Sequence, residues 1–207
     1  MGGTDSYSAV ERRLIAPFRR FMASLLSPLV WLLARLGVHP NLISGLQIPG
    51  GVAVILLADS HPRVAFLIFV STLLLDGIDG ALARATGRSS TFGALFDQFA
   101  DHFRETLVIA ALAVDGGLSV LLAVLYPFVY TSLNLTLYLA NQHGAPLPLA
   151  IKSYMVVYPA IFLYLWWGVN ILNVAVALSL FLMGAVITMG LWNLSRAMNE
   201  GGRAHHA

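Results

Sequence analysis

The chain has 207 residues, of which 58% are hydrophobic and 11% are charged, and its mean hydropathy is +0.78. Because soluble domains carry about 25% charged residues, this composition excludes an ordinary soluble protein and predicts an integral membrane protein. The sequence has no cysteine, which excludes disulfides and thiol chemistry. The arginines lie beside apolar segments, so the basic pI of 9.2 favours anionic lipid headgroups over nucleic acid as a partner.

The first predicted element is a helix that lies in the plane of the lipid headgroups. Its apolar residues share one helical face, and its basic residues gather on the other. The basic residues are Arg12, Arg13, Arg19 and Arg20. An amphipathic helix packed on protein is the alternative. We assign residues 1–36 to an N-terminal tail with this juxtamembrane helix, and residues 37–207 to a membrane domain with a short cytoplasmic tail.

Six apolar segments follow, so we expect an all-α membrane protein with six transmembrane helices. The expected spans are 42–57, 64–85, 92–114, 118–140, 149–169 and 171–194, and a polar tail follows the last. Pro49, Gly50 and Gly51 interrupt the first span. We expect them to kink it and to leave free backbone groups facing a cavity.

The basic residues are unevenly distributed between the two sides of this topology. An even number of spans puts both termini on one side, where most lysines and arginines also fall, whereas Arg63 falls on the other. The positive-inside rule therefore predicts that both termini and the end of the second span are cytoplasmic. The expected location is the inner or cell membrane of a bacterium or an archaeon.

Four aspartates lie between residues 76 and 101 of this apolar sequence. Asp76 and Asp79 are three residues apart and Asp97 and Asp101 are four apart, so each pair shares one face of a helix. Ionised carboxylates near membrane depth need partners, and the two arginines between the pairs cannot offset four negative charges. Oxygen ligands without cysteine predict bound divalent cations, Mg²⁺ or Mn²⁺ before Zn²⁺.

The spacing of this segment is more specific than its charge. It reads Asp76-x2-Asp79-Gly80-x2-Ala83-Arg84-x8-Gly93-x3-Asp97-x3-Asp101. Position by position, it resembles the signature of the CDP-alcohol phosphatidyltransferase family of integral membrane phospholipid synthases. The resemblance implies metal-dependent transfer of a phosphatidyl group from CDP-diacylglycerol to a small polar alcohol, with release of CMP. It also implies a homodimer.

The resemblance implies a role for each residue of the signature. The four aspartates would bind two divalent cations, and Asp101 would also be the catalytic base that deprotonates the acceptor hydroxyl. The nucleotide and diphosphate would lie against the other four positions: Gly80, Ala83, Arg84 and Gly93.

The acceptor is predicted from residues outside the signature. Three cations are candidates for binding it: Arg104, Lys152 and Arg196. They favour an acceptor that carries a phosphate, such as inositol phosphate or glycerol 3-phosphate, as in a phosphatidylinositol phosphate synthase. Alternatively, Lys152 and Arg196 are anchors that reach toward headgroups. Glu105 fits a pattern frequent among inositol-phosphate-type relatives, whereas His102 departs from it, which leaves the acceptor open.

Two other classes of protein could also carry acidic residues in membrane helices. A small cation transporter would also hold intramembrane aspartates, but it gives no reason for Gly80, Ala83, Arg84 and Gly93 at fixed offsets. A non-catalytic scaffold with the same fold would not need every acidic position, and all four are present. Both readings are therefore weaker than the enzyme.

Overall fold

The structure is a computed structural model that describes residues 9–145, 147 and 153–204, with side chains for 21–22, 24–145, 147 and 155–198. Regular structure in these ranges is helical throughout, which confirms the all-α expectation. The helices are α1 (Ala9–Arg35), α2 (Pro40–Leu57), α3 (Pro62–Ala85), α4 (Thr91–Val114), α5 (Val120–Gln142), α6 (Ser153–Trp167) and α7 (Leu172–Ala204). α7 thus continues through much of the predicted polar tail.

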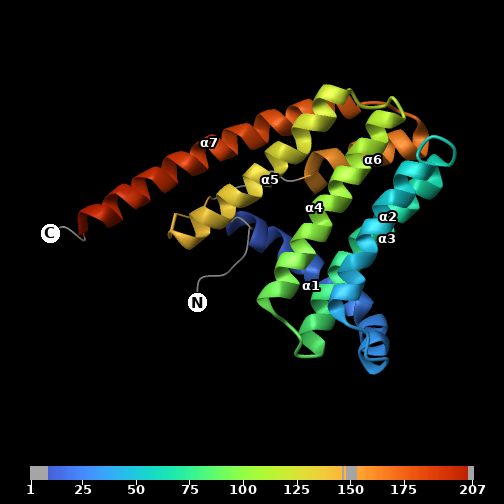
Figure 1. The fold of residues 1–207 in the computed structure, drawn as a ribbon, viewed down its shortest axis with the longest axis horizontal. Helices are drawn as coiled ribbons and strands as arrows, with labels where there is room; N and C mark the ends of the chain where they lie inside the picture. Colours follow the sequence, from blue (N-terminus) through green and yellow to red (C-terminus); the bar gives the residue numbers. More distant parts are fainter. Residues whose placement is uncertain (1–8, 146, 148–152, 205–207) are drawn as a thin grey trace.

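The helices form two groups that diverge from a common end (Figure 1). α2 lies between α3 and α4 and contacts both, whereas α3 and α4 contact each other little. α5 packs on α7, and α6 connects the groups through contacts with α3 and α7. The α3–α4 loop lies at the open end, away from the end of α7. All four aspartates belong to the group of α2, α3 and α4.

Local signals fix where the helices next to the aspartates begin and end. Pro40 and Pro62 occupy the first turns of α2 and α3, where a missing N–H breaks no helical bond. The Ser90 hydroxyl caps α4 by accepting a hydrogen bond from the Gly93 N–H at 3.0 Å. After α1, Gly37 adopts a φ of 71°, a left-handed conformation that favours glycine.

The glycine pair within α2 is a contact point between helices. A Cβ at Gly50 would overlap Thr72 Cγ2 of α3, and a Cβ at Gly51 would lie 2.9 Å from Leu107 Cδ1 of α4. The missing side chains therefore let α2 approach both neighbours closely. The expectation that this stretch faces a cavity is wrong, because side chains of α3 and α4 fill the space.

In the part of the chain that the structure describes, four helices are long and apolar enough to cross a membrane by length and composition. These are α2, α3, α5 and the part of α7 from Leu172 to Met198. α4 has the same length as α3, 24 residues, but it carries four charged residues, Asp97, Asp101, Arg104 and Glu105, and is too polar to be counted with them. α6 is apolar but has 15 residues. The structure thus supports a membrane protein with four clear spans, and the six-span topology stays a prediction.

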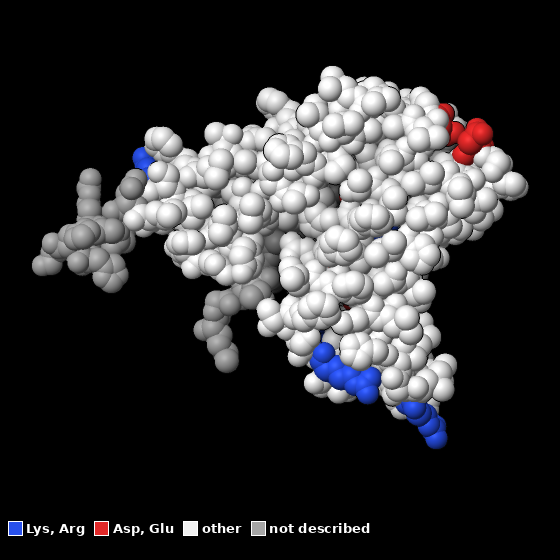
Figure 2. All heavy atoms as spheres, in the orientation of Figure 1, with Lys and Arg blue, Asp and Glu red and all other residues white. Residues whose placement is uncertain are grey.

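Charged side chains gather at the ends of the molecule (Figure 2). On the face shown, basic side chains lie at the open end and near the end of α7, and acidic side chains lie at the opposite corner, by the α2–α3 turn. Between them few charged atoms reach the surface of this face. This distribution is typical of a protein with a lipid-covered belt.

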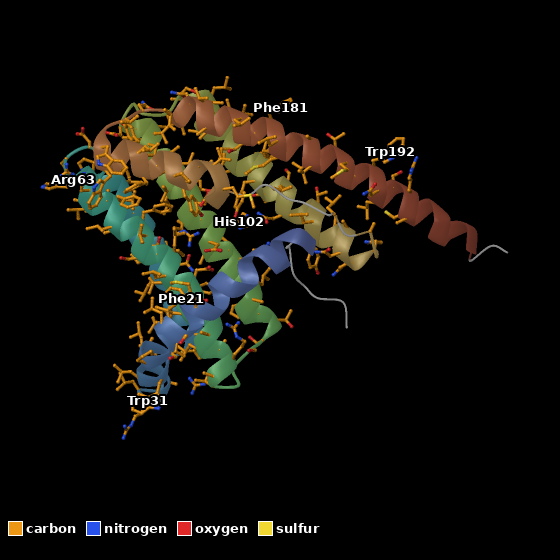
Figure 3. The ribbon with its side chains drawn as sticks, turned by 180° about the vertical axis from the view of Figure 1, so that it is seen from behind. Phe21, Trp31, Arg63, His102, Phe181 and Trp192 are labelled. Carbon is orange, nitrogen blue, oxygen red and sulfur yellow. The ribbon has the colours of Figure 1, made fainter. Side chains whose placement is uncertain are left out.

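α1 packs on α3 with one side and leaves apolar residues exposed on the other. Val30 is buried against Ile78 and Leu82, whereas Phe21 and Trp31 are more than half exposed (Figure 3). Exposed aromatic residues suit a helix in contact with lipid. The four arginines predicted for the basic face lie outside the described side chains, so the interfacial assignment stays a prediction.

Candidate active site

Three carboxylates from two helices converge near the open end of the molecule. Asp76 of α3 and Asp97 and Asp101 of α4 each bring one oxygen within 4.8 Å of the others. The helical period places Asp97 and Asp101 on one face of α4, and α2 holds that face toward α3. All three side chains are half-buried. The predicted aspartate cluster is therefore brought together from residues more than twenty positions apart.

Asp79 lies beside this group with a partner of its own. Its side chain is 3% exposed, and its Oδ2 accepts a hydrogen bond from the Ser44 hydroxyl of α2 at 2.6 Å. Asp76 and Asp97 are its charged neighbours. The hydrogen bond fixes the Asp79 carboxylate at the edge of the cluster, and its role as a metal ligand stays a prediction.

The residues present fit a hard divalent cation. The Oδ1 atom of Asp97 is buried, and the described part of the chain offers it no hydrogen-bond partner. An acceptor in that position is costly unless a cation or a donor reaches it. The cluster consists of carboxylate oxygens, the ligands that Mg²⁺ and Mn²⁺ prefer. The arrangement therefore matches the predicted type of metal site.

A pocket of about 240 Å³ opens next to Asp79 and Asp97. All four positions predicted to cradle the nucleotide and diphosphate line it. Two of them are glycines. A Cβ at Gly93 would lie 3.1 Å from Ser90 Oγ, which is a crowded position, whereas one at Gly80 would make an ordinary contact with Arg84 Nη1 at 3.4 Å. The missing side chain therefore matters for space at Gly93, and Arg84 lies beside Gly80 at the pocket wall.

The pocket also has walls that the signature does not include. The first turns of α2 and the α3–α4 loop supply them, in particular Pro40, Asn41, Ser44, Arg88 and Ser90. Arg88 donates a hydrogen bond to the Gly37 carbonyl at 3.3 Å, which joins the loop to the turn before α2. Asn and Ser are frequent near the beginnings of helices, so the sequence indicates that Asn41 and Ser90 lie near such ends. No local signal indicates that the beginnings of α2 and α4 lie side by side.

The three residues predicted to bind the acceptor are placed differently from one another. Arg104 is buried and forms an ion pair with Asp101 at 2.7 Å. Arg196 lies over the ring of Trp192 at 5.0 Å, on the part of α7 that extends away from the α3–α4 loop (Figure 3). Lys152 lies outside the described residues. The structure thus brings Arg104, but not Arg196, to the carboxylates.

A buried polar cluster continues from Asp101 along α4. Glu105, 3% exposed, accepts hydrogen bonds from the hydroxyls of Tyr126 at 3.1 Å and Tyr158 at 2.7 Å. On the next face, His102 Nε2 lies 3.3 Å from the Asn134 amide nitrogen. These contacts tie α4 to α5 and α6. They give Glu105 partners from other helices, so its burial does not require a metal ion.

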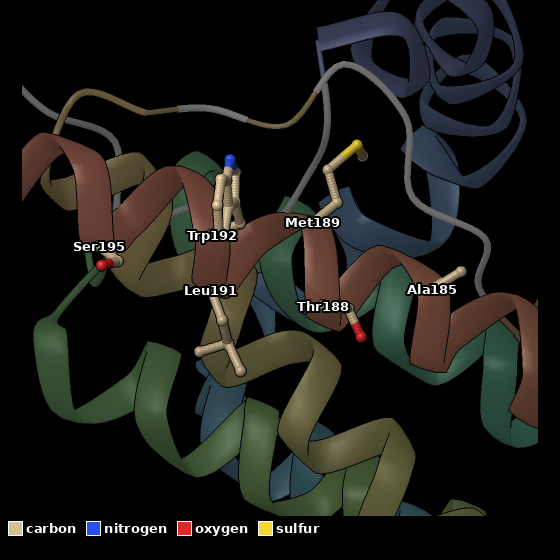
Figure 4. Close-up of a pocket in the computed structure, with 6 residues that line it drawn as sticks. All are labelled: Ala185, Thr188, Met189, Leu191, Trp192 and Ser195. Atoms are coloured by element: carbon tan, nitrogen blue, oxygen red, sulfur yellow. The ribbon is translucent and has the colours of Figure 1, made fainter.

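A larger hollow of about 740 Å³ lies on α7 (Figure 4). Its lining residues are Ala185, Thr188, Met189, Leu191, Trp192 and Ser195. Among the described residues, the lining contains no carboxylate and no cation. The hollow therefore lacks the groups that a phosphate or a metal ion needs, and the smaller pocket at the aspartates is the candidate active site.

Comparison with known proteins agrees with the geometry. Residues 37–196 match the family model described as CDP-alcohol phosphatidyltransferase. An archaetidylinositol phosphate synthase of Aeropyrum pernix is 35% identical over 101 residues, which are 47% of this chain and 52% of that protein. A phosphatidylinositol phosphate synthase of Streptomyces avermitilis is 30% identical over 143 residues, 65% of this chain and 58% of that protein.

A CDP-diacylglycerol–serine O-phosphatidyltransferase of Helicobacter pylori is 42% identical over 65 residues, 31% of this chain and 27% of that protein. The chain spans about half the length of the curated relatives that it matches with highest significance. The family model, in contrast, covers most of the chain and includes the whole aspartate signature. The chain therefore belongs to the CDP-alcohol phosphatidyltransferase family.

Proposed function

We propose that this protein transfers a phosphatidyl group from CDP-diacylglycerol to a phosphorylated polyol, such as inositol phosphate or glycerol 3-phosphate, and releases CMP. The observation that carries the proposal is the pocket beside Asp79 and Asp97, because six of the eight residues of the signature line it together. Its volume of about 240 Å³ lies near the lower end of ligand pockets. It suits a pyrophosphate and part of a nucleotide, while the acyl chains stay in the bilayer.

The names of the relatives support the acceptor class. Two of the three similar proteins are named as synthases of inositol phosphate lipids, whereas the third is named for serine. A cation transporter is not favoured, because ion passage gives no reason for the glycines that line the pocket. A phosphorylated polyol is accordingly the first acceptor to test, with serine as the contrasting one.

In this proposal the chain's own residues orient the reactants. Asp76, Asp97 and Asp101, with Asp79 beside them, would hold two divalent cations, Mg²⁺ or Mn²⁺. When bound, such ions stabilise charge on the attacking and leaving oxygens of a phosphoryl transfer. Arg84, exposed at the pocket wall, would donate to a phosphate oxygen.

Asp101 is the proposed base for the acceptor hydroxyl. One of its oxygens is paired with Arg104, so the other would accept the proton as the hydroxyl oxygen attacks the phosphorus. The bond between that phosphorus and the CMP oxygen would break. Proximity is the chain's main contribution, because a fixed hydroxyl beside a fixed phosphate reacts without a further loss of entropy.

The proposal includes six membrane spans, with the site and both termini on the cytoplasmic side. α4 would then cross the membrane with its polar residues turned toward α2, α5 and α6, where their partners lie. This placement lets a lipid-linked nucleotide and a water-soluble alcohol meet without extraction of the lipid.

The test is CMP release by the purified protein with CDP-diacylglycerol and one acceptor at a time: inositol phosphate, glycerol 3-phosphate, inositol or serine. We expect release with a phosphorylated acceptor, its loss on chelation and its return with Mg²⁺ or Mn²⁺. Asp97→Asn should abolish it, because the variant lacks a charged metal ligand. Asp59→Asn, at an exposed turn, is the matched control. CMP release that persists in Asp97→Asn would contradict the proposal.

A further inference from the structure

Arg104 is a buried cation next to the candidate site and outside the signature. Its side chain is 4% exposed, and its Nη1 donates to Asp101 Oδ1 at 2.7 Å. The same nitrogen donates to Gln47 Oε1 of α2, and Gln47 is itself fully buried. One nitrogen of the guanidinium thus joins the last aspartate of the signature to the neighbouring helix.

The packing of α2 on α4 keeps this contact in place. A Cβ at Gly51, one turn from Gln47, would lie 3.4 Å from Arg104 Cα. The two backbones are therefore close where the Gln47–Arg104 bond forms, and both side chains are buried there. Hydrogen bonds in such surroundings are strong and hold their geometry.

The charges of the reactants explain a cation in this position. Under the proposed function, four carboxylates and a pyrophosphate diester would together bring six negative charges to the site. Two divalent ions would supply four positive charges, and Arg84 and Arg104 would supply the other two. The adjacent residue, Glu105, accepts hydrogen bonds from tyrosines of other helices with both of its oxygens. The ion pair of Arg104 is formed with Asp101 instead.

We propose that Arg104 is a positioning residue: held by Gln47, it fixes the Asp101 carboxylate so that one oxygen faces the metal cluster and the acceptor. It does not touch the acceptor itself. The effect of Arg104 on catalysis rests on the proposed function. Its effect on metal binding does not. It replaces the prediction that Arg104 binds the acceptor, because a side chain with 4% exposure and two protein partners offers the acceptor little access.

The test measures Mn²⁺ affinity by electron paramagnetic resonance, with CMP present and the acceptor absent. Arg104→Gln should weaken Mn²⁺ binding about 10- to 100-fold, as partners of metal ligands typically do. Gln47→Met should weaken it less, and the double variant should be no weaker than Arg104→Gln, since Gln47 acts through Arg104. Arg104→Lys should recover part of the loss, because one ammonium can donate to both oxygens. Tyr158→Phe, which removes a hydrogen bond from Glu105 but none from Asp101, is the matched control and should bind Mn²⁺ like the wild type.

Other results would overturn this role. If Arg104→Gln raised only the KM for the acceptor and left Mn²⁺ affinity unchanged, Arg104 would be an acceptor ligand. Tighter Mn²⁺ binding in Arg104→Gln would mean that the cation only repels the metal, and additive losses would mean that Gln47 acts separately. If Arg104→Gln does not fold, the Mn²⁺ affinities of Gln47→Met and Arg104→Lys still test whether Arg104 positions Asp101. If the Mn²⁺ results hold but the wild type releases no CMP, the proposed function fails and the role of Arg104 stands.

Discussion

The aspartates of the site differ in the partners that the protein gives them. Asp79 accepts a hydrogen bond from the neutral Ser44 hydroxyl, whereas Asp101 is paired with the cation of Arg104. A hydroxyl orients a carboxylate without neutralising it, so Asp79 keeps its full attraction for a metal ion. The ion pair holds one oxygen of Asp101, so under the proposed role of Arg104 the other oxygen faces the metal cluster and the acceptor. The protein's contacts thus give the two carboxylates different surroundings: a neutral hydroxyl beside Asp79 and a cation beside Asp101.

At this scale Ser44→Ala tests the contact with Asp79. Without the hydroxyl, the buried carboxylate loses its fixed orientation, and we expect kcat/KM for CMP release to fall about tenfold or more. Initial rates measured across Mg²⁺ concentrations check this. Ser71→Ala is the control, because Ser71 of α3 is exposed and its hydroxyl donates to Leu67 of its own helix. Equal rates for Ser44→Ala and the wild type would show that Asp79 needs no such partner.

Gly93→Ala tests the pocket wall. The new Cβ would lie 3.1 Å from Ser90 Oγ and 3.3 Å from Asn41 Oδ1, so the wall must shift into the space for the diphosphate. We expect kcat/KM for CDP-diacylglycerol to fall roughly tenfold, a change of about 1.4 kcal/mol. The Tm should stay the same or rise, because alanine is favoured over glycine within a helix by about 0.5–1 kcal/mol.

Gly184→Ala separates the effect of an alanine on helix stability from its effect on the pocket. Among the described residues, no atom outside the local helix backbone lies within 4 Å of the Cβ position at Gly184 of α7, so this variant should keep full activity while gaining the same helical preference. Substrate titrations and thermal unfolding in detergent measure both. A parallel loss of Tm and activity in Gly93→Ala would mean that the glycine serves folding and not the pocket.

At the scale of helices, the sequence predicts what is local and misses what depends on contact between helices. Hydropathy and spacing placed Asp76 and Asp79 on one helix and Asp97 and Asp101 on the next, because helical period and apolar length are properties of a short segment. The identity of the helix that packs between these two helices depends on the whole fold and not on a short segment. Ser44 was therefore missed, although it contacts Asp79.

The same limit applies to two other expectations, of which the first is corrected and the second stays a prediction. The interruption at Pro49, Gly50 and Gly51 looked like a lining for a cavity, but small residues equally permit close packing, and only the neighbouring helices distinguish the two. Arg104 looked like an acceptor ligand from its position after Asp101. Its burial against Gln47 depends on how α2 lies on α4, which no periodicity shows.

Gly50→Ala tests the crossing of α2 and α3. Its Cβ would overlap Thr72 Cγ2, so we expect the free energy of unfolding to fall by about 1–3 kcal/mol, as for other overpacked sites. Thermal unfolding in detergent measures the loss as a lower Tm. Adding Thr72→Ser should restore most of it, because serine lacks the clashing methyl group and keeps the hydroxyl that donates to Phe69. If the double variant is no more stable than Gly50→Ala, the two helices do not meet here.

At the scale of the whole molecule, arginine and tryptophan pairs agree with two membrane boundaries. Arg35 lies 5.3 Å from the Trp31 ring and Arg196 lies 5.0 Å from the Trp192 ring, near the basic ends of α1 and α7. Arg63 lies 5.8 Å from the Trp166 ring, far from both (Figure 3). Tryptophan with a cation is typical of the lipid–water interface. The separation of these pairs favours an orientation in which the helices between them cross the bilayer.

Labelling of single-cysteine variants tests the six-span topology, and the absence of native cysteine makes it direct. With a membrane-impermeant maleimide, Ser89→Cys and His143→Cys should react from the cytoplasmic side. Ser60→Cys, Ser119→Cys and Val169→Cys should react from the opposite side. All five positions are exposed and lie between consecutive helices. Each pair of neighbouring positions thus reports whether the helix between them crosses.

The result for α4 is decisive, because α4 is the span that composition alone does not support. Its first turn is capped by Ser90 at the pocket, and just past its other end Asp115 accepts a hydrogen bond from Tyr164 of α6 at 2.5 Å. A helix of 24 residues is about 36 Å long, enough to cross the hydrocarbon core. Labelling of Ser89→Cys and Ser119→Cys from the same side would contradict a crossing by α4. It would also place Asp97 and Asp101 in a helix that only enters the membrane, and the aspartate site would then need another account of how it meets a lipid.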